Sequence, residues 1–124
     1  MVGIVLISHS AALAAEVAAL AAAIGGPEVP VAAAGGTDDG GLGTSPDKVA
    51  AAIKAVDRGA GVILIPDLGS SVLTARLLEE PDSVVIADVP FVEGAISAVV
   101  TAGADAPLAA VLRAAEEARE IRKL

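Results

Sequence analysis

The sequence predicts a single α/β domain, built as a three-layer, doubly wound arrangement with helices on both faces of a four-stranded, mainly parallel sheet. Three observations support this fold class. Short runs of β-branched and aliphatic residues recur along the chain, as expected of strands buried on both faces. An amphipathic segment follows each run, which is typical of parallel strands joined by crossover helices. The 124 residues suit one core, and no repeat or linker divides residues 1–124.

The first predicted strand, Val2–Ile7, leads directly to the only histidine of the chain, His9. Ser10 can cap the helix that follows, and Gly25-Gly26-Pro27 ends it. The large apolar residues of this helix fall on one face and predict a core-facing stripe: Leu13, Val17, Leu20 and Ile24.

The second unit begins with the predicted strand Val29–Ala34, where Pro30 favours an edge strand or a strand start. A glycine-rich loop, residues 35–44, follows, and its backbone is rich in free N–H groups. The alternative interpretation of this loop is a flexible connector. Ser45-Pro46-Asp47 signals the start of a helix. The predicted buried stripe of that helix is Val49, Ile53 and Val56.

Two further units complete the predicted fold. The strand Val62–Ile65 ends in Pro66-Asp67-Leu68-Gly69-Ser70-Ser71, which opens a third helix, and the strand Val84–Ala87 precedes a fourth helix. A charged tail from Glu116 to Lys123 is expected to be solvated. The apolar residues of the last three helices are Val72, Leu73 and Leu77 in the third, Val92, Ile96 and Val99 in the fourth, and Leu108, Val111 and Leu112 in the fifth.

Composition argues against several classes of protein. A net charge of -8 and the absence of Trp and Tyr make nucleic-acid binding unfavourable, and the acidity favours a basic partner. With no Cys and one His, no disulfide, thiolate nucleophile, metal site or other cofactor is expected. Charges interrupt every apolar run, so we expect no membrane span, and the absence of Cys fits a cytoplasmic protein. The glycine signatures of Walker A, dinucleotide-binding and serine hydrolase sites are absent.

His9 and Asp67 form the candidate reactive pair. Each follows a predicted parallel strand, and chemistry in open α/β sheets lies at the carboxyl ends of strands. A carboxylate that accepts the Nδ1–H would leave Nε2 as a nucleophile for a phosphoryl group. Helix starts near Ser10, Thr44 and Ser70 could hold the phosphoryl oxygens. The alternative is structural: His9 as a hydrogen-bonded loop residue, and Asp67, Ser70 and Ser71 as helix caps.

Four stretches, spread in order along most of the chain, carry a family resemblance. They are Val2–Ser10, Ala34–Asp39 continuing to Leu42-Gly43-Thr44, Pro66–Ser71, and Val89-Pro-Phe-Val-Glu-Gly94. The chain resembles the DhaM phosphotransferase subunits of phosphoenolpyruvate-dependent dihydroxyacetone kinase. Those subunits belong with the mannose-type EIIA domains of the bacterial phosphotransferase system.

The resemblance implies a specific activity and fold. His9 would take a phosphoryl group from phospho-HPr through Nε2, Asp67 would orient the ring, and the group would pass to ADP bound on the subunit DhaL, which serves the kinase subunit DhaK. It implies strand order 2-1-3-4 and a homodimer. Some relatives continue into HPr-like and enzyme I-like domains, whereas this sequence is expected to comprise the first module alone. It would then need separate phosphodonors. The expected phosphoryl-binding residues are Ser10, Thr37, Gly43, Thr44, Gly69, Ser70 and Ser71.

Two other functions remain open at this point. One is a mannose-type EIIA that hands its phosphoryl group to the EIIB domain of a sugar transporter. The other is a non-catalytic α/β regulatory domain in which His9 is structural.

Overall fold

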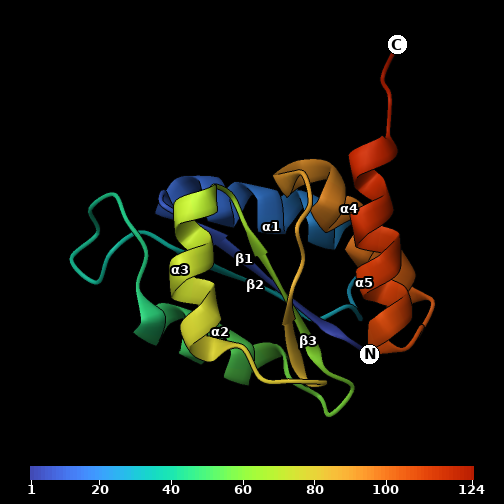
Figure 1. The fold of residues 1–124 in the computed structure, drawn as a ribbon, viewed down its shortest axis with the longest axis horizontal. Helices are drawn as coiled ribbons and strands as arrows, with labels where there is room; N and C mark the ends of the chain where they lie inside the picture. The colour runs from blue at the N-terminus through green and yellow to red at the C-terminus, as the bar shows by residue number, and fades with distance from the viewer.

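The computed structural model describes all of residues 1–124 as an α/β fold in which strands and helices alternate (Figure 1). Every predicted strand and helix is present, with small shifts at the strand ends. The strands are β1 (Gly3–Ser8), β2 (Val31–Gly35), β3 (Val62–Pro66) and β4 (Val84–Ile86). The helices are α1 (Ala11–Gly25), α2 (Pro46–Val56), α3 (Gly69–Leu78), α4 (Phe91–Gly103) and α5 (Leu108–Glu117), followed by a 3₁₀ turn, η1 (Ala118–Glu120).

The sheet is parallel, and its strand order, β2-β1-β3-β4, confirms the expected 2-1-3-4 order. β2 lies at an edge, as Pro30 indicated. β1 pairs with β2 on one side and β3 on the other, so that Ile7 lies opposite both Ala34 and Pro66. All three strands therefore end at the same edge of the sheet, where the residues that follow β1 and β3 meet.

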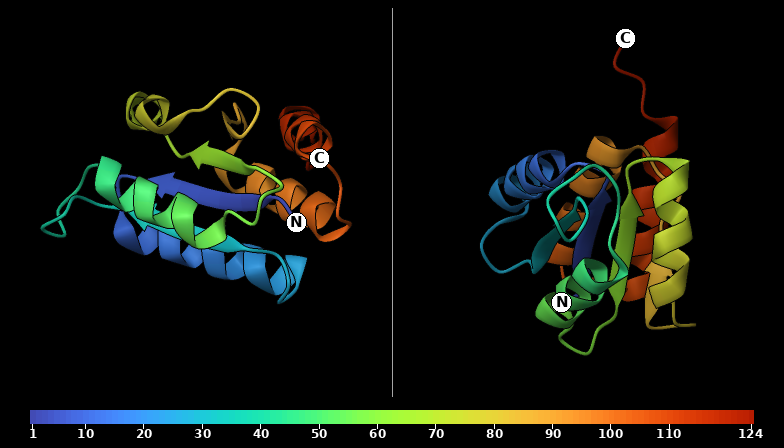
Figure 2. Two further views of the ribbon diagram at one scale, coloured as in Figure 1. Left: turned by 90° about the horizontal axis from the view of Figure 1, so that it is seen from below. Right: turned by 90° about the vertical axis from the view of Figure 1, so that its left-hand side faces the viewer.

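Helices cover both faces of the sheet, which confirms the doubly wound, three-layer arrangement (Figures 1 and 2). One face packs against α1, α4 and α5 around buried residues such as Ile4, Leu6 and Ile63. The other face packs against α2 and α3 around Val5, Ile7 and Leu64. Residues of β1 and β3 alternate between the two cores, which is why both strands are apolar throughout.

The predicted core-facing stripe of α1 was wrong. Val17 is buried, but Leu13, Leu20 and Ile24 are exposed. The helix packs instead through its small residues, and its buried positions are Ala14, Val17 and Ala21. Because α1 is apolar on almost every side, the spacing of its larger residues did not identify the face that meets the sheet.

The predicted stripes of α2 and α5 are largely confirmed, whereas those of α3 and α4 include exposed residues. In α2, Val49 and Val56 are buried as predicted and Ile53 is half-buried. In α4, Val99 is buried, Ile96 is half-buried and Val92 is exposed. In α3, Leu73 and Leu77 are exposed and Val72 is half-buried. Alanines occupy the buried positions of these two helices: Ala95, Ala98 and Ala102 in α4 and Ala75 in α3. Val111 of α5 is buried, with Leu108 and Leu112 packed beside it.

Glycines permit this close packing of helices on the sheet. A Cβ at Gly35 would come within 2.6 Å of the Ser10 carbonyl oxygen and 2.8 Å of Ala11 Cα. The end of β2 and the first turn of α1 can therefore touch only because residue 35 has no side chain. A Cβ at Gly94 of α4 would overlap the side chain of Val89 in the segment before the helix, which accounts for the glycine of the Val89–Gly94 stretch.

The C-terminal tail is mostly exposed, as predicted, but it is not free of contacts. Lys123 Nζ lies 2.8 Å from Glu93 Oε1 of α4, and this ion pair lowers the pKa of Glu93 and raises that of Lys123. Ala118 of η1 is buried. None of the helices combines the length and the apolarity that crossing a membrane requires.

Candidate active site

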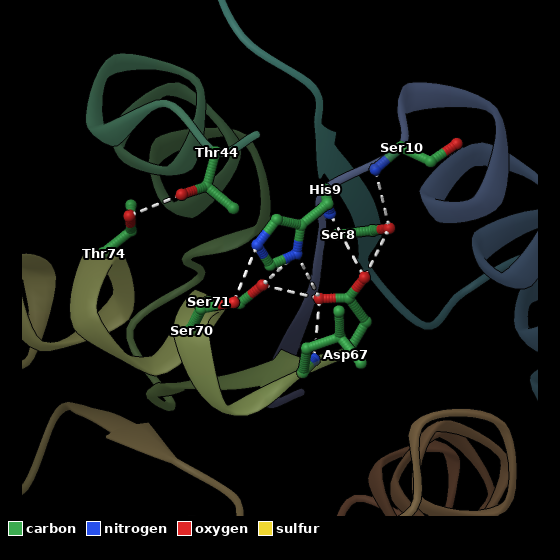
Figure 3. Close-up of polar contacts among 9 residues, drawn as sticks. Ser8, His9, Ser10, Thr44, Asp67, Ser70, Ser71 and Thr74 are labelled. Atoms are coloured by element: carbon green, nitrogen blue, oxygen red, sulfur yellow. Dashed lines mark hydrogen bonds and ion pairs between the residues drawn. The ribbon is translucent and has the colours of Figure 1, made fainter. Parts of the chain in front are cut away.

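The sheet brings His9 and Asp67 together, although 58 positions separate them in the sequence. His9 follows β1 and Asp67 follows the neighbouring strand β3. His9 Nδ1 lies 3.2 Å from Asp67 Oδ1 (Figure 3). The His9 side chain is 28% exposed and that of Asp67 only 8%, so the ring can be reached from solvent while the carboxylate lies behind it.

Five hydrogen bonds hold the Asp67 carboxylate. Oδ2 accepts from Ser8 Oγ at 2.9 Å and from the His9 backbone N–H at 3.2 Å. Oδ1 accepts from Ser71 Oγ at 2.5 Å, from the Leu68 N–H at 2.7 Å and from His9 Nδ1. Burial alone would raise the pKa of Asp67, but the hydrogen bonds, above all those from Ser71 and Ser8, outweigh burial and lower the pKa to about 2. The carboxylate is therefore ionised at neutral pH.

The hydrogen bonds of Asp67 also determine the tautomer of His9. Since Asp67 is ionised, the short contact with Ser71 requires the Ser71 hydroxyl to donate its one proton to the carboxylate. Ser71 Oγ, which also lies 3.1 Å from His9 Nδ1, can then only accept from the ring. Nδ1 must carry the hydrogen, so in the neutral ring Nε2 carries the lone pair. The geometry thus leaves a nucleophilic nitrogen on the exposed side of the ring.

Ser70 lies at that nitrogen. Its Oγ is 2.9 Å from His9 Nε2, and because Nε2 carries no hydrogen in this tautomer, the hydroxyl donates to it. Ser70 belongs to the first turn of α3, where the N–H groups of Gly69 and Ser70 make no hydrogen bond within the protein. These donors and the positive end of the helix dipole belong to the same turn whose Ser70 side chain contacts Nε2, and such a helix start favours an anion. No Lys or Arg forms an ion pair with His9 or Asp67.

The glycine-rich loop meets His9 through its backbone. The Gly43 N–H donates to the His9 carbonyl oxygen at 2.9 Å. Thr44 Oγ1 and Thr74 Oγ1 are 2.6 Å apart, which joins the end of the loop to α3 on the side of the ring away from Asp67 (Figure 3). Lys48 Nζ donates to the Gly35 carbonyl at 3.0 Å and fixes the start of the loop. The loop therefore positions His9 through its backbone and makes no hydrogen bond to the ring.

The predicted site residues fall into two groups. The geometry gathers His9, Asp67, Gly69, Ser70 and Ser71 around the imidazole, with Gly43 and Thr44 next to them. Two residues lie differently: Ser10 Oγ accepts from the Leu13 N–H and caps α1, and Thr37 Oγ1 donates to Asp39 inside the loop. Asp67 is not the cap of α3, since Leu68 occupies that position without a side-chain cap.

Ser8 is the residue that the sequence analysis missed. It is fully buried at the end of β1, donates to Asp67 Oδ2, and accepts from the Ser10 N–H at 3.0 Å. Ser8 therefore links the carboxylate to the start of α1 behind the ring. The available signal was a hydroxyl at the last position of an otherwise apolar, two-sided strand, where a buried polar group requires partners. No group of three His, Asp or Glu side chains lies close enough to hold a metal ion.

The chain is similar in sequence to several known proteins. Residues 3–112 match a family model described as PTS system fructose IIA component, EIIA-man. The chain is 37% identical, over 95% of its length, to the "PEP-dependent dihydroxyacetone kinase, phosphoryl donor subunit DhaM" of Pantoea ananatis, of which the match covers 27%. A DhaM subunit from Providencia stuartii is 33% identical over 99% of this chain and 28% of its own length.

Shorter relatives match over most of their own length. A DhaM subunit of kinase 2 from Listeria innocua is 33% identical, over 81% of this chain and 85% of the relative. The crystal structure of the unknown function protein EF1359 has a TM-score of 0.81 at 30% identity and covers 94% of this chain and 93% of its own. The chain thus spans about a quarter of the Pantoea and Providencia proteins, at 27% and 28%, but most of the Listeria one.

Proposed function

Because the chain belongs to the mannose-type EIIA family of the phosphotransferase system, which includes DhaM subunits, we propose that it carries a phosphoryl group on His9. The donor in this proposal is phospho-HPr, and the acceptor is ADP bound on a DhaL subunit, with DhaK phosphorylating dihydroxyacetone downstream. The names of the relatives, phosphoryl donor subunits of dihydroxyacetone kinase, support this acceptor.

One observation carries the proposal: the exposed nitrogen of His9 is the one that bears the lone pair. Asp67 and Ser71 hold Nδ1–H on the inner side of the ring, so Nε2 is left facing the donors of α3. The hydrogen bonds of Nδ1 are part-buried, whereas the one hydrogen bond of Nε2, with the hydroxyl of Ser70, is exposed.

The transfer step follows from this arrangement. The Nε2 lone pair attacks the phosphorus of the donor, the Nε2–P bond forms, and the P–N bond to the donor's histidine breaks. No proton leaves Nε2, because it held none, and the ring becomes positively charged with its Nδ1–H still on Asp67. The ionised carboxylate stabilises that charge. In the second half-reaction a β-phosphate oxygen of ADP attacks phosphorus, the new P–O bond forms, the Nε2–P bond breaks, and the neutral ring returns.

Ser70 has to turn away from Nε2 before phosphorus can bond there. Once turned, its hydroxyl can donate to a phosphoryl oxygen, next to the free N–H groups of Gly69 and Ser70. Hydrogen-bond donors of this kind stabilise the anionic group without an ion pair. A carrier needs this balance, since the group has to leave again.

We also propose that the protein is a cytoplasmic homodimer, as the family resemblance implies. An apolar surface on two helices that pack together supports self-association: Leu20 and Ile24 of α1 and Val100 of α4 are exposed. Sedimentation equilibrium of the wild-type chain tests the dimer. The location follows from the proposed partners.

Phosphorylation in a reconstituted system tests the carrier function. With enzyme I, HPr and labelled phosphoenolpyruvate, we expect an acid-labile, alkali-stable phosphate on His9, mapped by mass spectrometry and absent from His9→Ala. Adding DhaL with ADP should drain the label from His9 into ATP. A wild-type chain that stays unlabelled would contradict the carrier function.

A second candidate acceptor is the EIIB domain of a sugar transporter, which the description of the matched family as a fructose IIA component favours. The same labelled protein separates the two. Transfer to DhaL-bound ADP supports the kinase, and transfer only to an EIIB domain supports the transporter.

A further inference from the structure

Asp67, His9 and Ser70 form a chain of hydrogen bonds in the order carboxylate, imidazole, hydroxyl. His9 Nδ1 lies 3.2 Å from Asp67 Oδ1, and Ser70 Oγ lies 2.9 Å from His9 Nε2 (Figure 3). Both distances are within the range in which hydrolases activate a serine through a histidine that a carboxylate orients. Such a triad is defined by its geometry and recurs on unrelated folds with different chain orders. The absence of a serine hydrolase signature from the sequence therefore does not exclude one.

The hydroxyl of Ser70 has no structural role that would occupy it. Its one hydrogen bond is to His9, and the residue is exposed. It does not cap α3, because Leu68 occupies the cap position and no side chain caps this helix. Ser71, by contrast, is fully buried and its proton is committed to Asp67. Ser70 is thus the hydroxyl that both the histidine and a dissolved substrate can reach.

Two backbone N–H groups at the start of α3 supply what a serine nucleophile needs next. When a hydroxyl attacks an ester, the carbonyl oxygen becomes negative and requires hydrogen-bond donors. The N–H groups of Gly69 and Ser70 make no hydrogen bond within the protein. That of Ser70 belongs to the nucleophile's own residue, so it lies close to any carbon bonded to Oγ. Serine proteases use the same pair, the N–H of the nucleophile and that of a preceding glycine.

The surroundings of Ser70 favour a small, uncharged substrate. Residues 36–47 include three aspartates and no Lys or Arg, and Asp67 is ionised behind the ring, so anionic esters are repelled. Leu73 follows Ser70 by one helical turn and is 70% exposed, which places an apolar contact beside the hydroxyl. A short acyl group or an aromatic leaving group could lie against it.

We propose that the protein, while His9 is unmodified, hydrolyses neutral esters of short carboxylic acids, with Ser70 as the nucleophile. In this reaction His9 is the general base and then the general acid, and Asp67 orients the ring. The proposal stands on the geometry of the three side chains and does not depend on the carrier function proposed above.

The reaction has two halves. In the first, the proton of Ser70 passes to His9 Nε2, the Oγ–C bond forms, and the carbonyl electron pair moves onto oxygen. The C–O bond to the leaving group then breaks, and the alcohol departs with the proton from Nε2. In the second half, water attacks the acyl carbon while Nε2 takes a proton from it. The C–Oγ bond breaks, Oγ regains that proton, and the carboxylic acid leaves.

Ester hydrolysis and phosphoryl transfer exclude each other at one atom. Both use the lone pair of His9 Nε2, either to take the proton of Ser70 or to bond to phosphorus. If His9 carries a phosphoryl group, Ser70 has no base. Labelling of His9 by phospho-HPr should therefore reduce ester hydrolysis in proportion to the label, and undiminished hydrolysis by a fully labelled chain would contradict the proposal.

Hydrolysis of p-nitrophenyl acetate by the purified, unlabelled chain tests the proposal directly. Ser70→Ala and His9→Ala should each lower the rate of p-nitrophenol release about 100-fold or more, toward the rate in buffer. Asp67→Asn should lower it at least about tenfold, because the ring can then hold the wrong tautomer. Ser83→Ala removes another exposed serine, one that bonds to Glu80, and should match wild type within about twofold.

A fluorophosphonate ester gives a second measurement that does not depend on turnover. Ser70 Oγ should bond to its phosphorus as fluoride leaves, and mass mapping should find the adduct on Ser70 in the wild type. The adduct should be missing from Ser70→Ala and strongly reduced in His9→Ala, with Ser83→Ala labelled like wild type. Circular dichroism of each variant checks that it is folded.

Three results would overturn the triad. Hydrolysis that is unchanged in Ser70→Ala would assign the reaction to the imidazole of His9 alone. An adduct on a residue other than Ser70 would remove the nucleophile from the proposal. A wild-type chain that hydrolyses the ester no faster than His9→Ala would show that the three hydrogen-bonded groups do not act together on an ester. None of these results bears on whether His9 accepts a phosphoryl group.

Discussion

Two loops border His9, and each contains an aspartate whose pKa is lowered by hydrogen bonds. The two aspartates differ in the groups to which they are bonded. In the segment after β3, Asp67 accepts from Ser71, Ser8 and His9 itself. In the glycine-rich loop, Asp39 accepts from Thr37 and from the Gly41 N–H, and these two bonds lower its pKa. The first network ends on the imidazole, whereas the second is closed within its own loop.

This difference shows that similar sequences of small polar residues can have different roles. The segment after β3 controls the imidazole side chain: its tautomer, its direction and the charge it can bear. The glycine-rich loop controls the backbone, through the Gly43 N–H on the His9 carbonyl. We therefore expect changes after β3 to alter phosphoryl transfer, and changes in the glycine-rich loop to alter mainly stability.

The largest expected effect comes from Asp67→Ala. The protein should fold, but transfer from phospho-HPr should slow about 10- to 1,000-fold, because the ring loses its orientation and the charged product loses its counterion. Rapid-quench kinetics measures this, with Asp39→Ala as the matched control. Unchanged kinetics in Asp67→Ala would make this carboxylate structural only.

Lowering the pH should reveal the same difference between the two aspartates in how much each stabilises the fold. The folded-state pKa of Asp67, about 2, lies below the ordinary value of 3.8, so the stabilisation is complete above about pH 4 and is lost as pH falls toward 2. The shift corresponds to about 2 kcal/mol of unfolding free energy. Urea denaturation at pH 7 and at pH 2.5 gives the loss of unfolding free energy between the two pH values. This loss should be smaller in Asp67→Asn than in wild type, by about the same amount. Asp39→Asn should flatten the curve less, since Asp39 is exposed.

Removing one hydroxyl from each loop gives a more selective comparison. Ser71→Ala removes the donor to Asp67 and the acceptor of Nδ1–H, and should slow transfer about tenfold, the loss expected for a hydrogen bond to a charged group. Thr37→Ala removes the donor to Asp39 and should leave transfer within twofold. Equal slowing in the two variants would contradict the division of roles.

Gly43→Ala should affect transfer less than Ser71→Ala does, and should act mainly on stability. Gly43 has φ +139°, and a Cβ there would come within 2.8 Å of Thr37 Cγ2. Both the strain and the contact should lower stability by about 1–2 kcal/mol, seen as a lower midpoint in thermal unfolding. Transfer should slow only a few-fold, because the imidazole contacts are unchanged. A loss as large as that of Asp67→Ala would mean that the loop acts on the ring.

The sequence was sufficient for the fold and for the meeting of His9 with Asp67, because the ends of neighbouring parallel strands share one edge. It was insufficient to identify which face of each helix packs against the core. In α1, leucines and alanines compete for the core, and the choice depends on how closely the helix approaches its neighbours: Gly35 permits close contact with β2, and Gly25 permits close contact with Val99 of α4. Ser8 was missed for a related reason: its role depends on Asp67, which is distant in sequence.

The direction of the imidazole also depends on Gly35, which has no side chain. At Gly35 the missing Cβ lets the first turn of α1 rest on β2, and the start of that turn is tied through Ser8 to Asp67. A single methyl group at position 35 would push on Ser10 and Ala11 rather than on any reacting atom. We therefore expect a side chain at position 35 to shift the start of α1, and with it Ser8 and Asp67, without changing any polar group around the nucleophile.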